Sequence, residues 1–129
     1  MLDIGSFWVP SNSVIHLGCN SYLYFSSSRK SFDNASVFSE FKSFDGDINE
    51  LQIQLFINDE LKQDGNVSMM INKPYEIIKE ANTFLSFEDG DILMSGTPKG
   101  VGEFKVGDRF LGKILYKNEI LIEKEFIVS

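Results

Sequence analysis

The 129-residue sequence predicts an α+β fold that is mostly antiparallel sheet, with one main helix near residues 73–86. Two predicted hairpins indicate the sheet, since each of two runs of alternating apolar residues is joined to a second strand by a turn that contains Asn. A third observation predicts the helix, because one stretch places its apolar residues at helical spacing. Apolar residues make up 43% of the chain and charged residues 24%, as in an ordinary globular domain.

Residues 1–29 form the first compositional unit and are rich in Ser and Asn. The apolar clusters Val14-Ile15 and Tyr22-Leu23-Tyr24-Phe25 could each form a short strand. We expect that the extreme N-terminus could be disordered, because terminal residues are the least constrained part of a domain.

The first predicted hairpin begins at Leu51, where apolar and polar residues alternate as far as Ile57. Asn58-Asp59 is a tight-turn pair, so residues 60–64 should return as the second strand, closed by Gly65-Asn66.

The predicted helix follows this hairpin. Pro74 fits its first turn, where a missing N–H costs nothing, and Asn72 is the expected N-cap. Five residues form one apolar stripe along it: Ile77, Ile78, Ala81, Phe84 and Leu85. Residues 91–95 should then form a short buried strand.

The second predicted hairpin joins residues 110–116 to residues 119–128 through Lys117-Asn118, since Asn tolerates positive φ. Its second strand should present four apolar residues on one face: Ile120, Ile122, Phe126 and Val128.

Residues 96–102, here called the glycine loop, hold three glycines and a proline, which is more than a connecting turn needs. Glycine is used where the backbone takes positive φ or where another group approaches closely. The hydroxyl of Thr97 would stand where the predicted strand ends, a position that suits a binding residue. The alternative is that the loop is a simple turn between strands.

The segment Gly90–Gly102, GDILMSGTPKGVG, resembles the C-terminal signature of the fumarylacetoacetate hydrolase family. Lys30-Ser31-Phe32-Asp33, the hairpin segment 55–65 and the stretch from Ser68 to Tyr75 resemble further family motifs in the same order. The resemblance implies a mixed β-roll, with residues 30–129 as the C-terminal part of the family domain and residues 1–29 as a divergent leader. It also implies hydrolysis of C–C bonds, decarboxylation or isomerisation of small oxo-acids.

The resemblance also implies roles for particular residues. Thr97 and the adjacent Gly96 would contact the substrate's carboxylate or carbonyl oxygen, and Lys30 would stabilise enolate charge. Gln63 would be a substrate-binding residue, although its role could be purely architectural, as could that of Gly65. Lys30 could equally be a solvated surface lysine.

Mg²⁺ or Mn²⁺ is the cofactor that the resemblance implies. The family's Glu-x-Glu pair and its later Asp lie upstream of the Lys-Ser-Phe segment, whereas the first Glu of this chain is Glu40. We therefore recognise no metal ligands and expect this truncated chain alone to be weakly active or inactive. The alternatives are a non-catalytic remnant and a partner subunit that lends its Thr97 loop to a companion chain.

The net charge and the cysteine content narrow the classes of partner and the cellular compartment that we expect. The net charge of −7, with scattered basic residues, argues against nucleic acid. The single Cys19 cannot form an intramolecular disulfide, and no signal peptide or membrane-length apolar run is present, so we expect a cytoplasmic protein without membrane contact. Twelve Phe residues favour a homodimer or a companion chain.

Three remaining patterns have simpler explanations than a metal site. Glu123 and Glu125 should lie on an exposed charged face of the last strand. Asp45-Gly46-Asp47 lacks the spacing of a calcium loop and should be a turn. We expect the single His16 to be structural.

Overall fold

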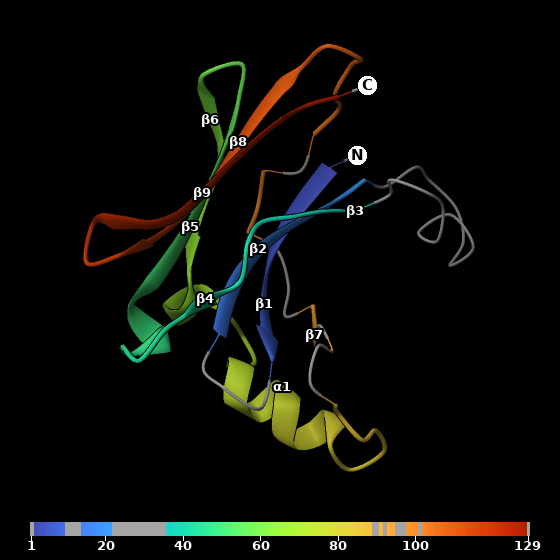
Figure 1. Ribbon diagram of the computed structural model, residues 1–129, viewed down its shortest axis with the longest axis vertical. Coiled ribbons are helices and arrows are strands. Elements are labelled where there is room, and N and C mark those ends of the chain that lie inside the picture. The colour runs from blue at the N-terminus through green and yellow to red at the C-terminus, as the bar shows by residue number, and fades with distance from the viewer. Residues whose placement is uncertain are drawn as a thin grey trace.

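The computed structural model of the protein describes residues 2–9, 14–21, 36–88, 91, 93–94, 98–100 and 102–128. In this part of the chain the strands form one five-stranded and one four-stranded sheet, and every strand pair is antiparallel. Figure 1 shows the helix at one end of the molecule and the turn of the first predicted hairpin at the opposite end. The predicted α+β class, mostly antiparallel sheet, is confirmed.

The four-stranded sheet has the order β6-β5-β8-β9 and is built from the two predicted hairpins. Its strands are β5 (Leu51–Ile57), β6 (Glu60–Asn66), β8 (Arg109–Tyr116) and β9 (Glu119–Ile127). Both central residues of each turn have positive φ, at 50° and 69° in the first and 51° and 67° in the second. Such turns match the twist of the flanking strands, which explains why Asn-Asp and Lys-Asn occupy them.

The five-stranded sheet collects strands from distant parts of the sequence. They are β1 (Leu2–Val9), β2 (Val14–Ser21), β3 (Ser36–Phe38), β4 (Lys42–Ser43) and β7 (Leu93–Met94). β2 confirms the strand expected at Val14-Ile15, while residues 22–25 lie outside the described part. Within the strand predicted over residues 91–95, Leu93 and Met94 form β7, which pairs with Phe7 and Trp8 of β1, while Asp91 is outside the strand and residues 92 and 95 lie outside the described part.

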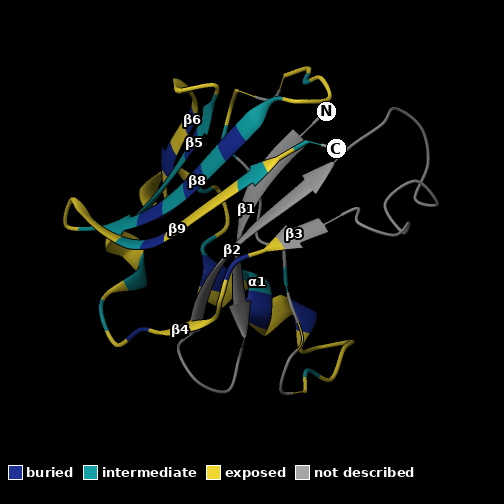
Figure 2. Ribbon diagram, turned by 45° about the horizontal axis from the view of Figure 1, so that its top comes forward, coloured by how far each residue is buried: buried dark blue, intermediate teal, exposed yellow. Residues whose placement is uncertain are grey.

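The core lies under the four-stranded sheet. Figure 2 shows buried residues recurring along β8, as expected for a strand with one face toward the interior. The fully buried cluster contains Phe44, Leu55, Phe110, Ile114 and Ile122. Phe110 is 0% exposed, and its ring stacks on that of Phe126 at 5.1 Å. Lys42 of β4 donates to the Leu121 carbonyl of β9 at 2.9 Å, which ties the two sheets together.

The apolar face predicted for the last strand is wrong at one residue. Ile122, Phe126 and Val128 pack in or against the core, but Ile120 is 51% exposed. The pairing changes register here, because Ile114 faces Ile122 while Leu115 faces Ile120. The extra residue, Leu121, forms a β-bulge that reverses the alternation and turns Ile120 outward.

The helix α1 spans Pro74–Ala81, within the predicted range but shorter than it. Pro74 lies in the first turn as expected, whereas the N-cap is Lys73 and not Asn72. The Lys73 backbone N–H donates to the Glu76 carboxylate at 2.9 Å, which satisfies one donor at the helix start.

The apolar stripe predicted for this helix is buried only at Ile78 and Ala81. Phe84 and Leu85 follow the end of the helix and are 70% and 51% exposed, so their predicted place on a buried stripe is wrong. The Thr83 hydroxyl donates to the Glu80 carbonyl at 2.7 Å and helps to end the helix, after which the helical spacing no longer applies. Two 3₁₀ turns, η2 (Ile48–Glu50) and η3 (Val67–Met69), complete the described helical segments.

Candidate functional site

Some of the predicted site residues lie within the described part of the chain, and the others lie outside it. Gln63 lies in β6 and is fully described, as are residues 98–100 of the glycine loop. Lys30, Gly96 and Thr97 lie outside the described residues. The site can therefore be built from β6 and from Pro98, which directly follows Thr97 in the chain.

Gln63 is buried in an edge strand and only 2% exposed. Its side-chain Nε2 donates to the main-chain carbonyl of Pro98 at 3.1 Å. A buried amide is stable only when it is hydrogen-bonded, so this contact explains how a glutamine can occupy a core-facing position.

Glycine at two positions lets the loop approach β6 closely. A Cβ at Gly65 would lie 2.6 Å from Cγ of Pro98, and a Cβ at Gly100 would lie 2.0 Å from the main-chain oxygen of Lys62. Gly100 also has a φ of +110°, which other residues rarely adopt. Residues 98–100 therefore pack directly against β6, an edge strand that would otherwise present free backbone groups.

β6 is locally irregular where the loop meets it. Leu55 pairs with Gln63 and Phe56 pairs with Leu61, so Lys62 is an extra residue in the strand. Such a bulge bends the strand and redirects its backbone groups. The carbonyl that Gly100 approaches belongs to this extra residue.

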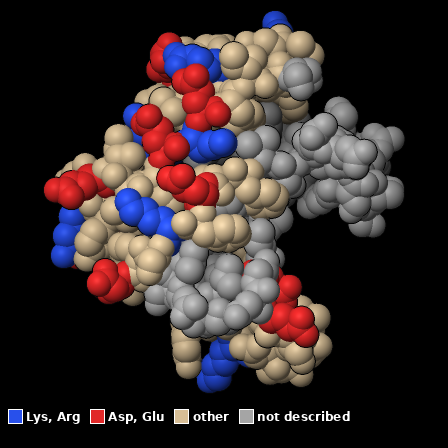
Figure 3. All heavy atoms as spheres, in the orientation of Figure 1, with Lys and Arg blue, Asp and Glu red and all other residues tan. Residues whose placement is uncertain are grey.

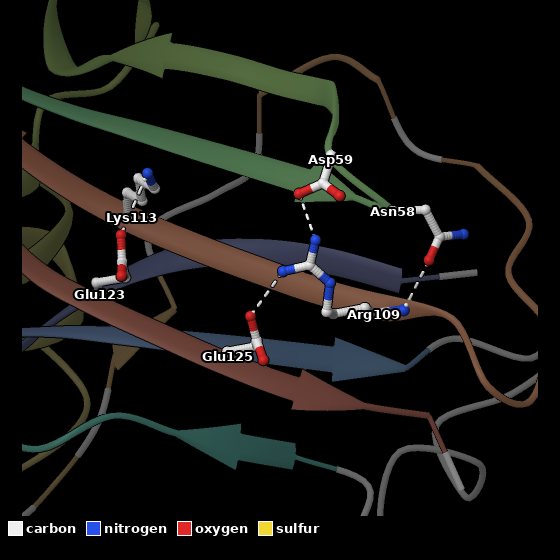
Figure 4. Close-up of polar contacts among 6 residues, drawn as sticks. All are labelled: Asn58, Asp59, Arg109, Lys113, Glu123 and Glu125. Atoms are coloured by element: carbon white, nitrogen blue, oxygen red, sulfur yellow. Dashed lines mark hydrogen bonds and ion pairs between the residues drawn. The ribbon is translucent and has the colours of Figure 1, made fainter.

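The segment that leaves the glycine loop is attached again where β8 begins. One carboxylate oxygen of Asp108 accepts from the Lys105 backbone N–H at 2.7 Å, and the other accepts from the Asn58 side chain at 2.8 Å. Asn58 also accepts from the Arg109 backbone N–H at 2.9 Å, as Figure 4 shows. The hydrogen bonds from Asn58 and Lys105 stabilise the ionised carboxylate and lower the pKa of Asp108 below its ordinary value of 3.8.

The outward face of β8 and β9 carries paired acidic and basic side chains and is not a cation site. Figure 3 shows acidic and basic side chains side by side on one face of the molecule. Arg109 pairs with Asp59 and, at 2.8 Å, with Glu125, while Lys113 pairs with Glu123 at 3.2 Å (Figure 4). Each of the two glutamates thus faces a cation on β8, and their position on an exposed charged face is confirmed.

The described residues do not by themselves fit a divalent ion. Among them, no three His, Cys, Asp or Glu side chains lie close enough together to hold a metal. The same part of the chain contains no helix with the length and apolar character that crossing a bilayer demands.

The loop glycines were expected to allow close approach of another group, but β6 was not predicted to be the strand that they contact. The Gln63–Pro98 hydrogen bond was not predicted, because it joins residues 35 positions apart, and the bulge at Lys62 has no signal in the alternation of the hairpin. A usable signal was Gly65, since glycine inside a strand often marks a place where another backbone comes near.

Comparison with known proteins places this architecture in context. A family model described as "Fumarylacetoacetate (FAA) hydrolase C-terminal" matches residues 20–120. The chain is 37% identical over 89 residues to a mitochondrial oxaloacetate tautomerase of Saccharomyces cerevisiae. It is 35% identical over 86 residues to a fumarylpyruvate hydrolase of a Ralstonia species.

The aligned parts cover 69% and 66% of this chain but only 34% and 45% of the two relatives. The chain thus spans less than half the length of these curated proteins.

A crystal structure of maleylpyruvate hydrolase from Sphingobium sp. SYK-6 has a TM-score of 0.89 at 20% identity, over 99% of this chain and 53% of that one. A second structure of that enzyme, in complex with manganese (II) ion and pyruvate, has a TM-score of 0.85 at 20% identity, over 99% of this chain and 54% of that one. At this identity the likeness concerns the fold.

Proposed function

Since the chain belongs to the fumarylacetoacetate hydrolase family, we propose that it acts in the chemistry of small oxo-acids, with the glycine loop as its substrate-binding element. The candidate reactions are hydrolysis of a C–C bond, decarboxylation and keto–enol isomerisation. The names of the two curated relatives, an oxaloacetate tautomerase and a fumarylpyruvate hydrolase, support an oxo-acid substrate.

The attachment of the loop to β6 is the observation that favours this proposal. Pro98 is hydrogen-bonded to a buried side chain and packs on Gly65, so the chain is held directly after Thr97. The Thr97 hydroxyl and neighbouring N–H groups would donate to a substrate oxyanion, and donors that are already held need little reorganisation during the reaction. Lys30 would add a positive charge for an enolate.

The cofactor of the proposed reaction is Mg²⁺ or Mn²⁺. The structural neighbour crystallised with manganese and pyruvate supports a divalent ion in this fold. The described residues bring no three His, Cys, Asp or Glu side chains together for a metal, so we expect the chain to turn over an oxo-acid weakly or not at all when tested by itself. The alternatives are a non-catalytic protein and a subunit that lends its Thr97 loop to a companion chain.

Calorimetric titration of the chain with Mn²⁺ and then oxalate, a planar enolate mimic, tests the proposal. If the chain carries out this chemistry by itself, oxalate should bind only with Mn²⁺, and Thr97→Val and Lys30→Gln should weaken that binding at least roughly tenfold through the loss of charge-assisted hydrogen bonds. Thr83→Val and Lys124→Gln are the matched controls, since Thr83 bonds to the helix end and Lys124 is exposed on β9.

The alternatives predict different heats. An absence of heat at every Mn²⁺ and oxalate concentration would favour the non-catalytic protein. Heat that appears only after a co-purifying chain is added would favour the shared site.

We also propose a homodimer, or a pairing with a companion chain, in the cytoplasm. Several large apolar side chains on and near α1 support association: Met69 is 67% exposed, Ile71 96%, Tyr75 70% and Phe84 70%. Sedimentation velocity over a range of concentrations tests it, and a monomer at all concentrations, with no co-purifying chain, would contradict it.

A further inference from the structure

We propose that Gln63 is a positioning residue, which holds residues Pro98–Gly100 of the glycine loop against β6 and does not itself touch the substrate. This inference rests on the proposed function of the loop. It differs from the expectation that Gln63 binds substrate, because the side chain is buried and directed at the main chain of the loop.

Two contacts from β6 fix the same residue, Pro98, at two different points. The Gln63 side-chain amide donates to the Pro98 carbonyl oxygen at 3.1 Å. The Pro98 ring lies so close to Gly65 that a Cβ added at Gly65 would be 2.6 Å from Cγ of the ring. Gln63 and Gly65 are two residues apart in a strand, so both point to the same face of the sheet. A carbonyl and a ring held together leave Pro98 little freedom to rotate, because its φ is already restricted by the ring.

A third contact fixes the loop two residues later. Gly100 lies against the carbonyl of Lys62, the extra residue of the β6 bulge. The contacts to Lys62, Gln63 and Gly65 thus hold both ends of Pro98–Gly100 against one short stretch of strand.

β6 is a suitable support because it belongs to the four-stranded sheet, whose strands contribute most of the core cluster. Gln63 is paired across the strand with Leu55, which is 1% exposed and part of the core cluster. Movement of Gln63 would therefore require displacement of a packed core residue. The buried Gln63 amide thus links residues 98–100 of the loop to the core of the four-stranded sheet, beside the close contacts at Gly65 and Gly100.

Amide hydrogen exchange followed by mass spectrometry tests this role without requiring catalysis. Gln63→Met keeps the side-chain volume but removes the donor, and Gly65→Ala keeps Gln63 but pushes Pro98 away. We expect residues 93–102 to exchange roughly tenfold faster in both variants, and residues 109–127 to stay unchanged. Gln52→Met is the matched control, because Gln52 also donates through its side chain on this hairpin, to Asp64 at 2.7 Å, but away from the loop.

Three results would overturn the proposal. The first is unchanged exchange of residues 93–102 in both Gln63→Met and Gly65→Ala. The second is an equal increase across 93–102 and 109–127, which would mean that Gln63 supports the whole fold. The third is faster loop exchange in Gln52→Met, because that effect would not be specific to Pro98.

Oxalate affinity in the presence of Mn²⁺ separates this inference from the proposed function. If the unmodified chain binds oxalate, Gln63→Met should weaken binding by about the factor by which loop exchange rises, while Gln52→Met should not. If the unmodified chain does not bind oxalate, the proposed function fails, and the exchange result still decides whether Gln63 holds the loop.

Discussion

The two sheets of this protein are specified in different ways. The four-stranded sheet consists of two hairpins, each closed by a two-residue turn with positive φ and signalled by a short local pattern. The five-stranded sheet joins β1 near the N-terminus to β7 at residues 93–94, a pairing across most of the chain. Local turn chemistry thus determines the two hairpins, whereas the β5–β8 pairing that joins them and the β1–β7 pairing depend on long-range packing. The glycine loop follows β7 of one sheet and rests on β6 of the other.

The largest expected effect concerns the core of the hairpin sheet. Phe110→Ala should lower the free energy of unfolding by about 3–5 kcal/mol, because the ring is fully buried between Phe104 and Phe126. Phe84→Ala is the matched control and should cost about 0.5 kcal/mol, since Phe84 is 70% exposed. Urea unfolding of both variants measures the difference. Equal losses of unfolding free energy in the two variants would contradict this prediction, because they would mean that the region after α1 is as tightly packed as the hairpin core.

An intermediate effect is expected where the glycine loop meets β6. Gly100→Ala should destabilise the protein by about 2 kcal/mol, because Gly100 has positive φ and its Cβ would collide with the Lys62 carbonyl. Gly102→Ala should be nearly neutral, since a Cβ there meets nothing within 4 Å. Thermal unfolding of the two variants tests this. Similar melting temperatures would mean that the loop does not depend on close contact with the strand.

The smallest effect is a pH dependence at the start of β8. Hydrogen bonds lower the folded-state pKa of Asp108 below 3.8, so its contribution to stability is complete above that value and is lost as pH falls through the folded-state pKa. The melting temperature of Asp108→Asn should therefore approach that of the unmodified chain as pH falls from about 6 to about 2. Asp45→Asn, at an exposed aspartate, provides the comparison. A gap that widens in acid would reverse the sign and contradict the assignment.

Features that depend on neighbouring residues were predictable from the sequence, whereas features that depend on contacts between strands were not. The turns at Asn58-Asp59 and Lys117-Asn118 were predictable, because positive φ restricts the residues that can stand there. The exposure of Ile120 was not, since the bulge at Leu121 depends on how β9 pairs with β8. The helix could be placed but its end could not, because Phe84 and Leu85 continue the spacing of the stripe without a surface to cover them. Of the candidate site, the glycines were predictable from composition, but their contact with β6 was not.

The amino-acid sequence alone determined the α+β class, the two hairpins and the likeness to an oxo-acid enzyme family, because these depend on residues that lie close together along the chain. Only the tertiary structure decided that β7 pairs with β1, that Lys62 forms a bulge and that Gln63 holds the Pro98 carbonyl. The first and third of these contacts join residues separated by tens of positions, while the bulge lies within one hairpin. Their geometry depends on how the two sheets fold against each other and has no signature in any short segment.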